Sequence, residues 1–145
     1  MHQPRTIDVL LAQYAASHRN PTNELIHVVC VPVIVFTLLG ILWSIHPALA
    51  LLACAAALAY YWRLSRPFAL GMLLMSAVML ALLALMPPMT VLPLSIAVFV
   101  VAWIGQFIGH KIEGKKPSFL DDLRFLLVGP LFVLGFLYRR LNLAY

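Results

Sequence analysis

Charged side chains are scarce in this sequence, and two long stretches have none. Only 10% of the 145 residues are charged, against about a quarter in an ordinary soluble domain. Residues 25–62 contain no charged side chain, and neither do residues 67–109. Because 63% of the residues are hydrophobic as well, the composition indicates a protein that lies in lipid. We expect one integral-membrane domain, residues 1–145.

Several common signals of function are also missing. The sequence has no HExxH motif, no GxSxG motif and no glycine loop for phosphate. Its net charge of +5 comes without the basic and aromatic patch of a nucleic-acid-binding protein, so no nucleic-acid partner is predicted. Cys30 and Cys54 both fall in apolar stretches, which favours small buried hydrophobic side chains over a disulfide or a metal pair.

Each uncharged stretch is long enough for two membrane spans, since one span needs about 20 apolar residues. Prolines mark a turn near the middle of each stretch, at residues 44–47 and 86–90. The sequence therefore predicts an all-α polytopic membrane bundle. Its four transmembrane helices are expected at about residues 25–44, 47–62, 68–86 and 91–109.

The lysines and arginines lie on one side of these predicted spans. They occur in the N-terminal segment, at residues 63–66 and in the segment after residue 110. By the positive-inside rule, both termini are expected on the cytoplasmic side of a bacterial inner membrane or an ER membrane. Both proline turns then lie on the other side, because four spans return the chain to the face where it began.

Two further segments are expected at the charged face. Residues 6–17 carry apolar side chains at helical spacing, which predicts an N-terminal amphipathic helix in the membrane interface. Residues 125–138 are apolar but short for a span, and Gly129-Pro130 interrupts them. This pattern predicts a C-terminal re-entrant or interfacial helical hairpin, with a fifth span as the alternative.

Three of the five histidines are predicted at one membrane depth on the charged side. They are His18, His27 and His110, whereas His46 falls in a turn on the opposite face and His2 in a frayed terminus. Ionisable groups at membrane depth are costly and are often functional. The alternative is a hydrogen-bonded polar cluster that only joins helices.

Polar and small residues accompany these histidines at helical spacing. Asn23 precedes His27 by four residues, and Gln106 and Glu113 flank His110 at four and three residues. Gly105 and Gly109 form a pair of small residues that would let another helix approach closely and bring His110 near the first span.

Imidazole and carboxylate groups of this kind can bind a divalent metal ion. Imidazole suits zinc, copper or iron, and a site with two or three histidines and a carboxylate leaves positions for oxygen and substrate in non-haem Fe(II) enzymes. Spacing alone does not select iron over zinc. The number of histidines favours one metal ion over a di-iron centre.

Two segments of the chain resemble the motifs of a known family. Residues 14–27, followed by Val31-Pro32, resemble the first motif of the membrane 2-hydroxy fatty acid dioxygenases of phytosphingosine metabolism and their bacterial relatives. Residues 106–117 resemble the second motif, and the similarity extends over nearly the whole chain. The resemblance implies an Fe(II)-dependent membrane enzyme. It would use O2 to convert long-chain 2-hydroxy fatty acids to fatty acids one carbon shorter, by α-oxidation.

The resemblance also implies roles for individual residues. His18, His27 and His110 would be iron ligands and catalytic residues. Glu113 would also belong to the catalytic site, as an iron ligand or next to the iron ligands. Basic side chains could pair with the substrate carboxylate from the aqueous side, although anchoring to the membrane is the alternative for the lysines. The predicted substrate-binding residues are Arg19, Asn23, Gln106, Lys111, Lys115 and Lys116.

Other functions remain open at this point. The same residues would suit a zinc-dependent membrane hydrolase. A non-enzymatic lipid-binding or assembly protein would use the histidines only to join helices. The expected partners of the dioxygenase are the lipid bilayer, a 2-hydroxy fatty acid and O2, and no oligomeric state is predicted.

Overall fold

Residues 5–145 are described by a computed structural model, and His2 lies outside them. Within that range the chain forms only helices and their connections, so the all-α prediction is confirmed. The helices are α1 (Thr6–Ala15), α2 (Pro21–Ile45), α3 (Pro47–Leu64), α4 (Arg66–Leu85), α5 (Pro88–Glu113), the short 3-10 helix η1 (Ser118–Leu120) and α6 (Phe125–Arg140).

Four of these helices, α2 to α5, are long and apolar enough to cross a membrane, at 18 to 26 residues each. The predicted four-span bundle is therefore confirmed. Proline stands in the first turn of all four helices, where its missing N–H costs no hydrogen bond. Asn20 caps α2, because its side-chain oxygen accepts a hydrogen bond from the backbone N–H of Thr22 at 2.9 Å.

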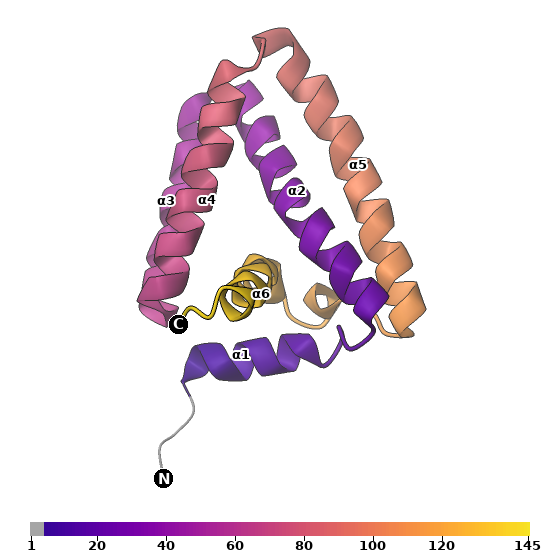
Figure 1. Ribbon diagram of the computed structural model, residues 1–145. Helices are drawn as coiled ribbons and strands as arrows, with labels where there is room; N and C mark the ends of the chain where they lie inside the picture. Colours follow the sequence, from indigo (N-terminus) through magenta and orange to yellow (C-terminus); the bar gives the residue numbers. More distant parts are fainter. Residues whose placement is uncertain (1–4) are drawn as a thin grey trace.

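The spans run up and down and leave the charged residues together at one end. Figure 1 shows the α2–α3 and α4–α5 turns at the top of the bundle, and α1, α6 and the remaining helix ends at the bottom. The turn residues carry no charge, so the charges of the described chain gather at the bottom end. His46 is at the top, where its Nδ1 accepts a hydrogen bond from the N–H of Ala48 at 3.2 Å.

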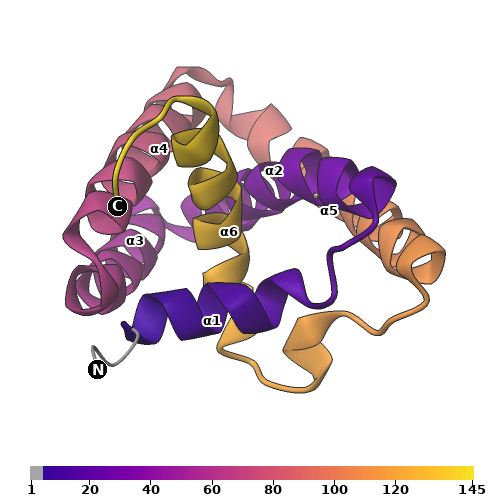
Figure 2. The same cartoon turned by 60° about the horizontal axis from the view of Figure 1, so that its bottom comes forward.

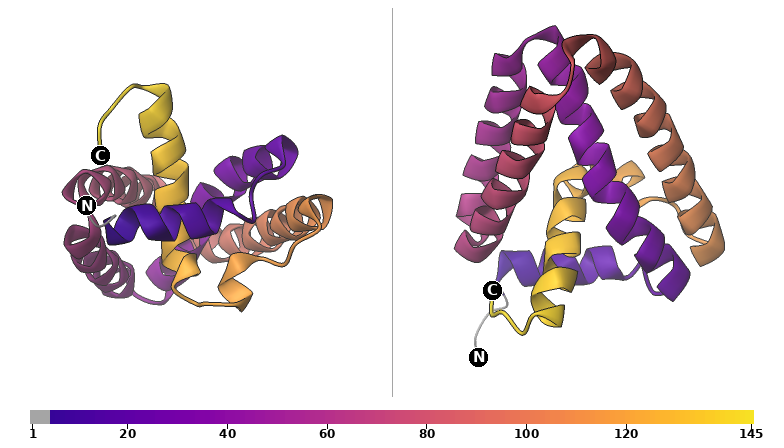
Figure 3. Two further views of the ribbon diagram at one scale, coloured as in Figure 1. Left: turned by 90° about the horizontal axis from the view of Figure 1, so that it is seen from below. Right: turned by 45° about the horizontal axis from the view of Figure 1, so that its top comes forward.

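Helix α1 lies beneath the spans, and α6 lies between their lower ends and crosses α1 (Figures 2 and 3). The apolar face of α1 is buried through Ile7, Leu10 and Tyr14, as the amphipathic pattern predicts. Helix α6 has 16 residues, so it is about 24 Å long. That is shorter than the hydrocarbon core of about 30 Å, which suits an interfacial helix better than a fifth span.

One detail of the C-terminal segment differs from the prediction. The expected hairpin is absent from the described structure, because α6 continues through Gly129-Pro130 as a single helix. Pro130 is the sixth residue of α6, so it removes only the hydrogen bond to the carbonyl of Leu126. Gly129 has a packing role, because a Cβ there would lie 3.0 Å from the hydroxyl of Tyr14.

The most extensive helix contact in the described chain is between α2 and α5. Two glycines of α5 face α2, as predicted. A Cβ on Gly105 would lie 2.9 Å from the sulfur of Cys30, and one on Gly109 would lie 2.5 Å from Oδ1 of Asn23. These missing side chains let the two backbones approach closely, and Cys30 serves as a free, partly buried thiol in that contact.

We expect Gly105→Val to destabilise the bundle by about 1–3 kcal/mol, because the added side chain overpacks the α2–α5 contact. The measurement is the free energy of unfolding in detergent micelles. Ala97→Val is the matched control, since Ala97 is exposed on the same helix. Adding Cys30→Ala should recover part of the loss. An equal loss in both valine variants would contradict the assignment of this contact.

Candidate active site

The three histidines of the charged face meet between α1, α2, α5 and α6. The rings of His18 and His27 have centroids 4.4 Å apart, and those of His18 and His110 are 4.9 Å apart. All three side chains are buried, with at most 5% of their surface exposed. His18 follows α1, His27 is in the second turn of α2, and His110 is in the last turn of α5. The even number of spans brings them together.

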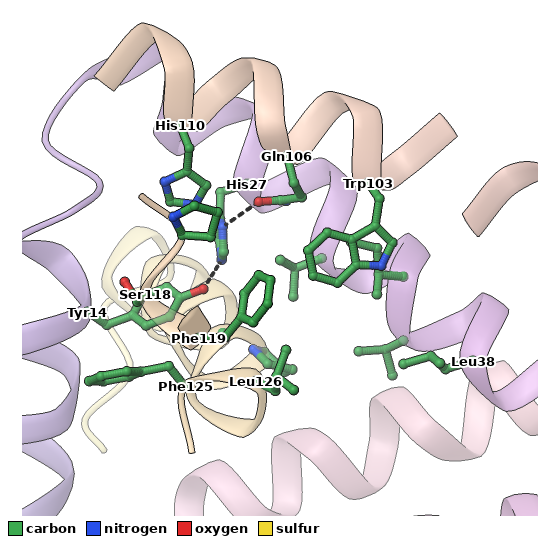
Figure 4. A pocket seen from close by; sticks show the side chains of 16 residues that line it. Tyr14, His27, Leu38, Trp103, Gln106, His110, Ser118, Phe119, Phe125 and Leu126 are labelled. Atoms are coloured by element: carbon green, nitrogen blue, oxygen red, sulfur yellow. Dashed lines mark hydrogen bonds between the residues drawn. The ribbon is translucent and has the colours of Figure 1, made fainter. Parts of the chain in front are cut away.

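His27 is held between two partners on its two ring nitrogens (Figure 4). Its Nδ1 is 3.2 Å from Oε1 of Gln106, and its Nε2 is 3.2 Å from the hydroxyl of Tyr14. Because an amide oxygen only accepts hydrogen bonds, Nδ1 of His27 carries the proton. Its Nε2 therefore offers a lone pair and accepts from the Tyr14 O–H.

His18 has the same tautomer for a similar reason. Its Nδ1 donates to the backbone carbonyl of Tyr14 at 2.9 Å, and its ring stacks on that of Tyr14 with centroids 4.6 Å apart. The lone pair is therefore on Nε2. Burial lowers the pKa of the His18 imidazole, so the ring is neutral at pH 7. A neutral imidazole is the form that binds metal ions.

Several polar atoms around these rings are buried without a partner in residues 5–145. They are Nε2 of His18, Nδ1 of His110, Nε2 of Gln106 and Oδ1 of Asn23. A buried polar atom without a hydrogen bond costs about 1–3 kcal/mol, so a group of four in one place suggests a missing ligand.

The donor set fits a metal ion in its chemistry, since it provides neutral imidazoles with free lone pairs. The ring positions do not complete such a site. Within residues 5–145 no three His, Cys, Asp or Glu side chains are arranged to hold a metal ion, because the imidazoles pack edge to face and His27 is bonded to Tyr14.

Glu113 is next to the histidines, but its carboxylate is already occupied. Its two oxygens accept hydrogen bonds from the backbone N–H groups of Arg19 and Asn20, at 3.0 and 2.8 Å, and from the side chain of Asn23 at 3.2 Å. Asn23 also donates to the carbonyl of Ser17 at 3.1 Å. Glu113 thus fixes the connection between α1 and α2, and with it the position of His18.

The predicted substrate-binding residues fall into two groups. Asn23 and Gln106 are buried and bonded to the network around the histidines. The basic side chains are exposed at the rim, and one of them has a structural contact, because Nζ of Lys115 donates to the carbonyl of Ala16 at 2.6 Å. The exposed basic residues are Arg19, Lys111, Lys115 and Lys116.

Three neighbours of the site were not predicted from the sequence. Tyr14 contacts both His18 and His27, and its position four residues before His18 was the available signal. Gly129 and Phe132 of α6 cover the rings, with the Phe132 centroid 5.5 Å from that of His18. Their role could not be predicted, because it depends on how α6 folds under the bundle.

A cavity of about 130 Å³ opens beside the imidazoles. His27, His110, Gln106 and Tyr14 line one end of it. The rest of its wall is largely apolar and comes from α2, α5, α6 and the η1 segment, including Leu38, Trp103, Phe119 and Leu126 (Figure 4). The site can therefore receive a molecule with one polar end and a hydrocarbon portion.

The chain is similar to one family of known proteins over nearly its whole length. The family model described as 2-hydroxy-palmitic acid dioxygenase Mpo1-like matches residues 5–141. A curated protein of Saccharomyces cerevisiae, 2-hydroxy-palmitic acid dioxygenase MPO1, is 32% identical over 138 residues, which cover 89% of this chain and 78% of the yeast protein. No solved structure matches the chain.

We expect Glu113→Ala to loosen the α1–α2 connection, because it removes three hydrogen bonds to a charged group. Trypsin should then cut after Arg19 about tenfold faster, since one such bond contributes about 1.5 kcal/mol or more. Cleavage after Arg140 in the same sample gives the internal reference. Asp121→Ala is the control carboxylate, exposed on the same face. Unchanged cleavage after Arg19 would contradict the inference that Glu113 fixes the α1–α2 connection.

Proposed function

Because the chain belongs to the 2-hydroxy-palmitic acid dioxygenase Mpo1-like family, we propose that it is a membrane dioxygenase that shortens long-chain 2-hydroxy fatty acids by one carbon. The reaction balances when one 2-hydroxy acid and one O2 give the shorter acid, CO2 and water. The observation that carries the proposal is the meeting of three buried imidazoles, two of which, His27 and His110, line the polar end of a largely apolar cavity.

The cofactor we propose is Fe(II), held by His18, His27 and His110. When bound, Fe(II) supplies the redox chemistry for O2 and a positive charge for the 2-hydroxy carboxylate. The hydrogen bonds of the chain support this choice of ligands. Gln106 and the Tyr14 carbonyl hold the Nδ1 protons of His27 and His18, which leaves Nε2 of each ring as the donor atom.

Other side chains would orient the substrate and exclude water. The Tyr14 hydroxyl bonds to Nε2 of His27. If Nε2 of His27 binds the metal ion, the Tyr14 O–H becomes free to donate a hydrogen bond to the substrate carboxylate. Trp103 and Phe119 close the cavity wall with apolar surface, and the exposed arginines and lysines at the rim would attract an anionic headgroup. Glu113 would act through the connection that it fixes, as a positioning residue.

We expect His18→Ala, His27→Ala and His110→Ala each to lower turnover of 2-hydroxypalmitate by at least about a hundredfold, since even changes outside the ligand shell cost 10–100-fold. The measurement is formation of the C15 acid by mass spectrometry. His46→Asn is the matched control, because His46 is at the opposite end of the spans and asparagine can keep its capping bond. Full turnover in the three alanine variants would refute the proposed site.

We expect protein purified without oxygen to bind roughly one Fe(II) per chain and to lose that ion and its activity with a chelator. Adding Fe(II) back should restore oxygen-dependent turnover, whereas Zn(II) should not. Rescue by zinc without oxygen consumption would favour a membrane hydrolase. Absence of any stoichiometric metal after gentle purification would favour a non-enzymatic lipid-binding or assembly protein.

A further inference from the structure

A second cavity shares part of its wall with the one beside the imidazoles. It has a volume of about 330 Å³ and is lined by α2, α3, α4 and α6. The two cavities share four lining residues. They are Val35, Leu38, Leu126 and Pro130. We propose that this second cavity receives the acyl tail of the substrate and that α3 sets the longest chain accepted, an inference that rests on the proposed function.

The path from one cavity to the other follows a single face of α2. His27, Val31 and Leu38 line the first cavity, and Leu38 and Leu42 line the second. These positions recur at spacings of four or seven residues, so they share one side of the helix. From His27 to Leu42 the helix rises by about 22 Å, at about 1.5 Å per residue.

That length matches a long fatty acid. Carbon–carbon bonds of about 1.52 Å at angles of about 111° advance an extended chain by about 1.25 Å per bond. A path of about 22 Å therefore holds about 18 carbons. The carboxylate and hydroxyl of such a chain would meet Tyr14, His27 and His110 at one end, and its methyl group would reach α3 at the other.

The wall of the second cavity suits a hydrocarbon and no polar ligand. None of its described lining residues is charged. The two hydroxyl groups among them are already bonded within the protein, since Tyr61 donates to the carbonyl of Leu127 at 2.9 Å and Ser76 to that of Leu73 at 3.1 Å. Apolar contacts alone remain for an occupant, and each buried methylene adds about fourfold to affinity.

Small side chains at the far end leave room for the end of the tail. Ala53, Cys54 and Ala57 of α3 line the second cavity, and of these Ala53 is nearest the α2–α3 turn. A large side chain at Ala53 would fill the space that the last carbons need. The longest substrates should then bind poorly, while shorter ones that end near Leu38 should be unaffected.

The test compares Ala53→Phe with Ala55→Phe, whose side chain is exposed on the same helix and outside both cavities. The measurement is kcat/KM for 2-hydroxy acids of 10 to 18 carbons. In Ala53→Phe the ratio for the 18-carbon acid over the 10-carbon acid should fall at least about tenfold, since a few methylenes at about fourfold each lose their contacts. Ala53→Leu provides a milder variant if Ala53→Phe folds poorly. Equal chain-length profiles in the Ala53 and Ala55 variants overturn the proposal.

A second readout does not depend on metal or turnover. A 2-hydroxy fatty acid of 16 carbons with a photoreactive diazirine near its methyl end is bound to metal-free protein and cross-linked. Labelling should fall on the peptide of α3 that contains residues 53–58 and be lost in Ala53→Phe but not in Ala55→Phe. Labelling spread over the lipid-facing helices, or labelling that Ala53→Phe leaves intact, overturns the proposal that the second cavity receives the acyl tail, even if the enzyme is active. Correct labelling without turnover would instead count against the dioxygenase function.

Discussion

Close packing of α2 against α5 sets the position of the polar groups in the site, because these helices carry His27, Gln106 and His110. Gly105 and Gly109 remove the side chains that would hold the two helices apart. In lipid the hydrophobic effect does not drive helices together, so close backbone contact and interhelical hydrogen bonds must do so. The bond between His27 and Gln106 spans the same contact at 3.2 Å. Fold and site therefore depend on one interface.

A second constraint is the cost of polar groups at this depth. The network around Glu113 satisfies the backbone N–H groups of Arg19 and Asn20, at the point where the chain enters the first span. Nε2 of His18 and Nδ1 of His110 are left without partners within the described residues. The backbone N–H groups of the connecting loop thus have hydrogen-bond partners, whereas two of the imidazole nitrogens do not within the described residues. This contrast is typical of a site that is completed by a ligand.

Much of this architecture could be predicted from the sequence, because lipid makes charge placement informative. The four spans, their turns, the gathering of charges at one end and the approach of His110 to α2 through Gly105 and Gly109 all follow from local patterns. The continuity of α6 through Pro130 did not, since proline signals a break, whereas Pro130 is near the start of α6 and removes only one hydrogen bond there. The occupation of Glu113 by backbone N–H groups was also beyond prediction, because those partners are distant in sequence.

The arrangement explains why such a site lies at the end of a bundle and not at its centre. A 2-hydroxy fatty acid has a carboxylate that must stay near water and a tail that prefers lipid. For this proposed substrate, imidazoles at the charged end of the spans would meet the first need, and the apolar cavities along α2 would meet the second. Tyr14 of α1 and Phe132 of α6 pack against the imidazoles, so bulk water is kept from the buried rings while the exposed basic residues remain outside.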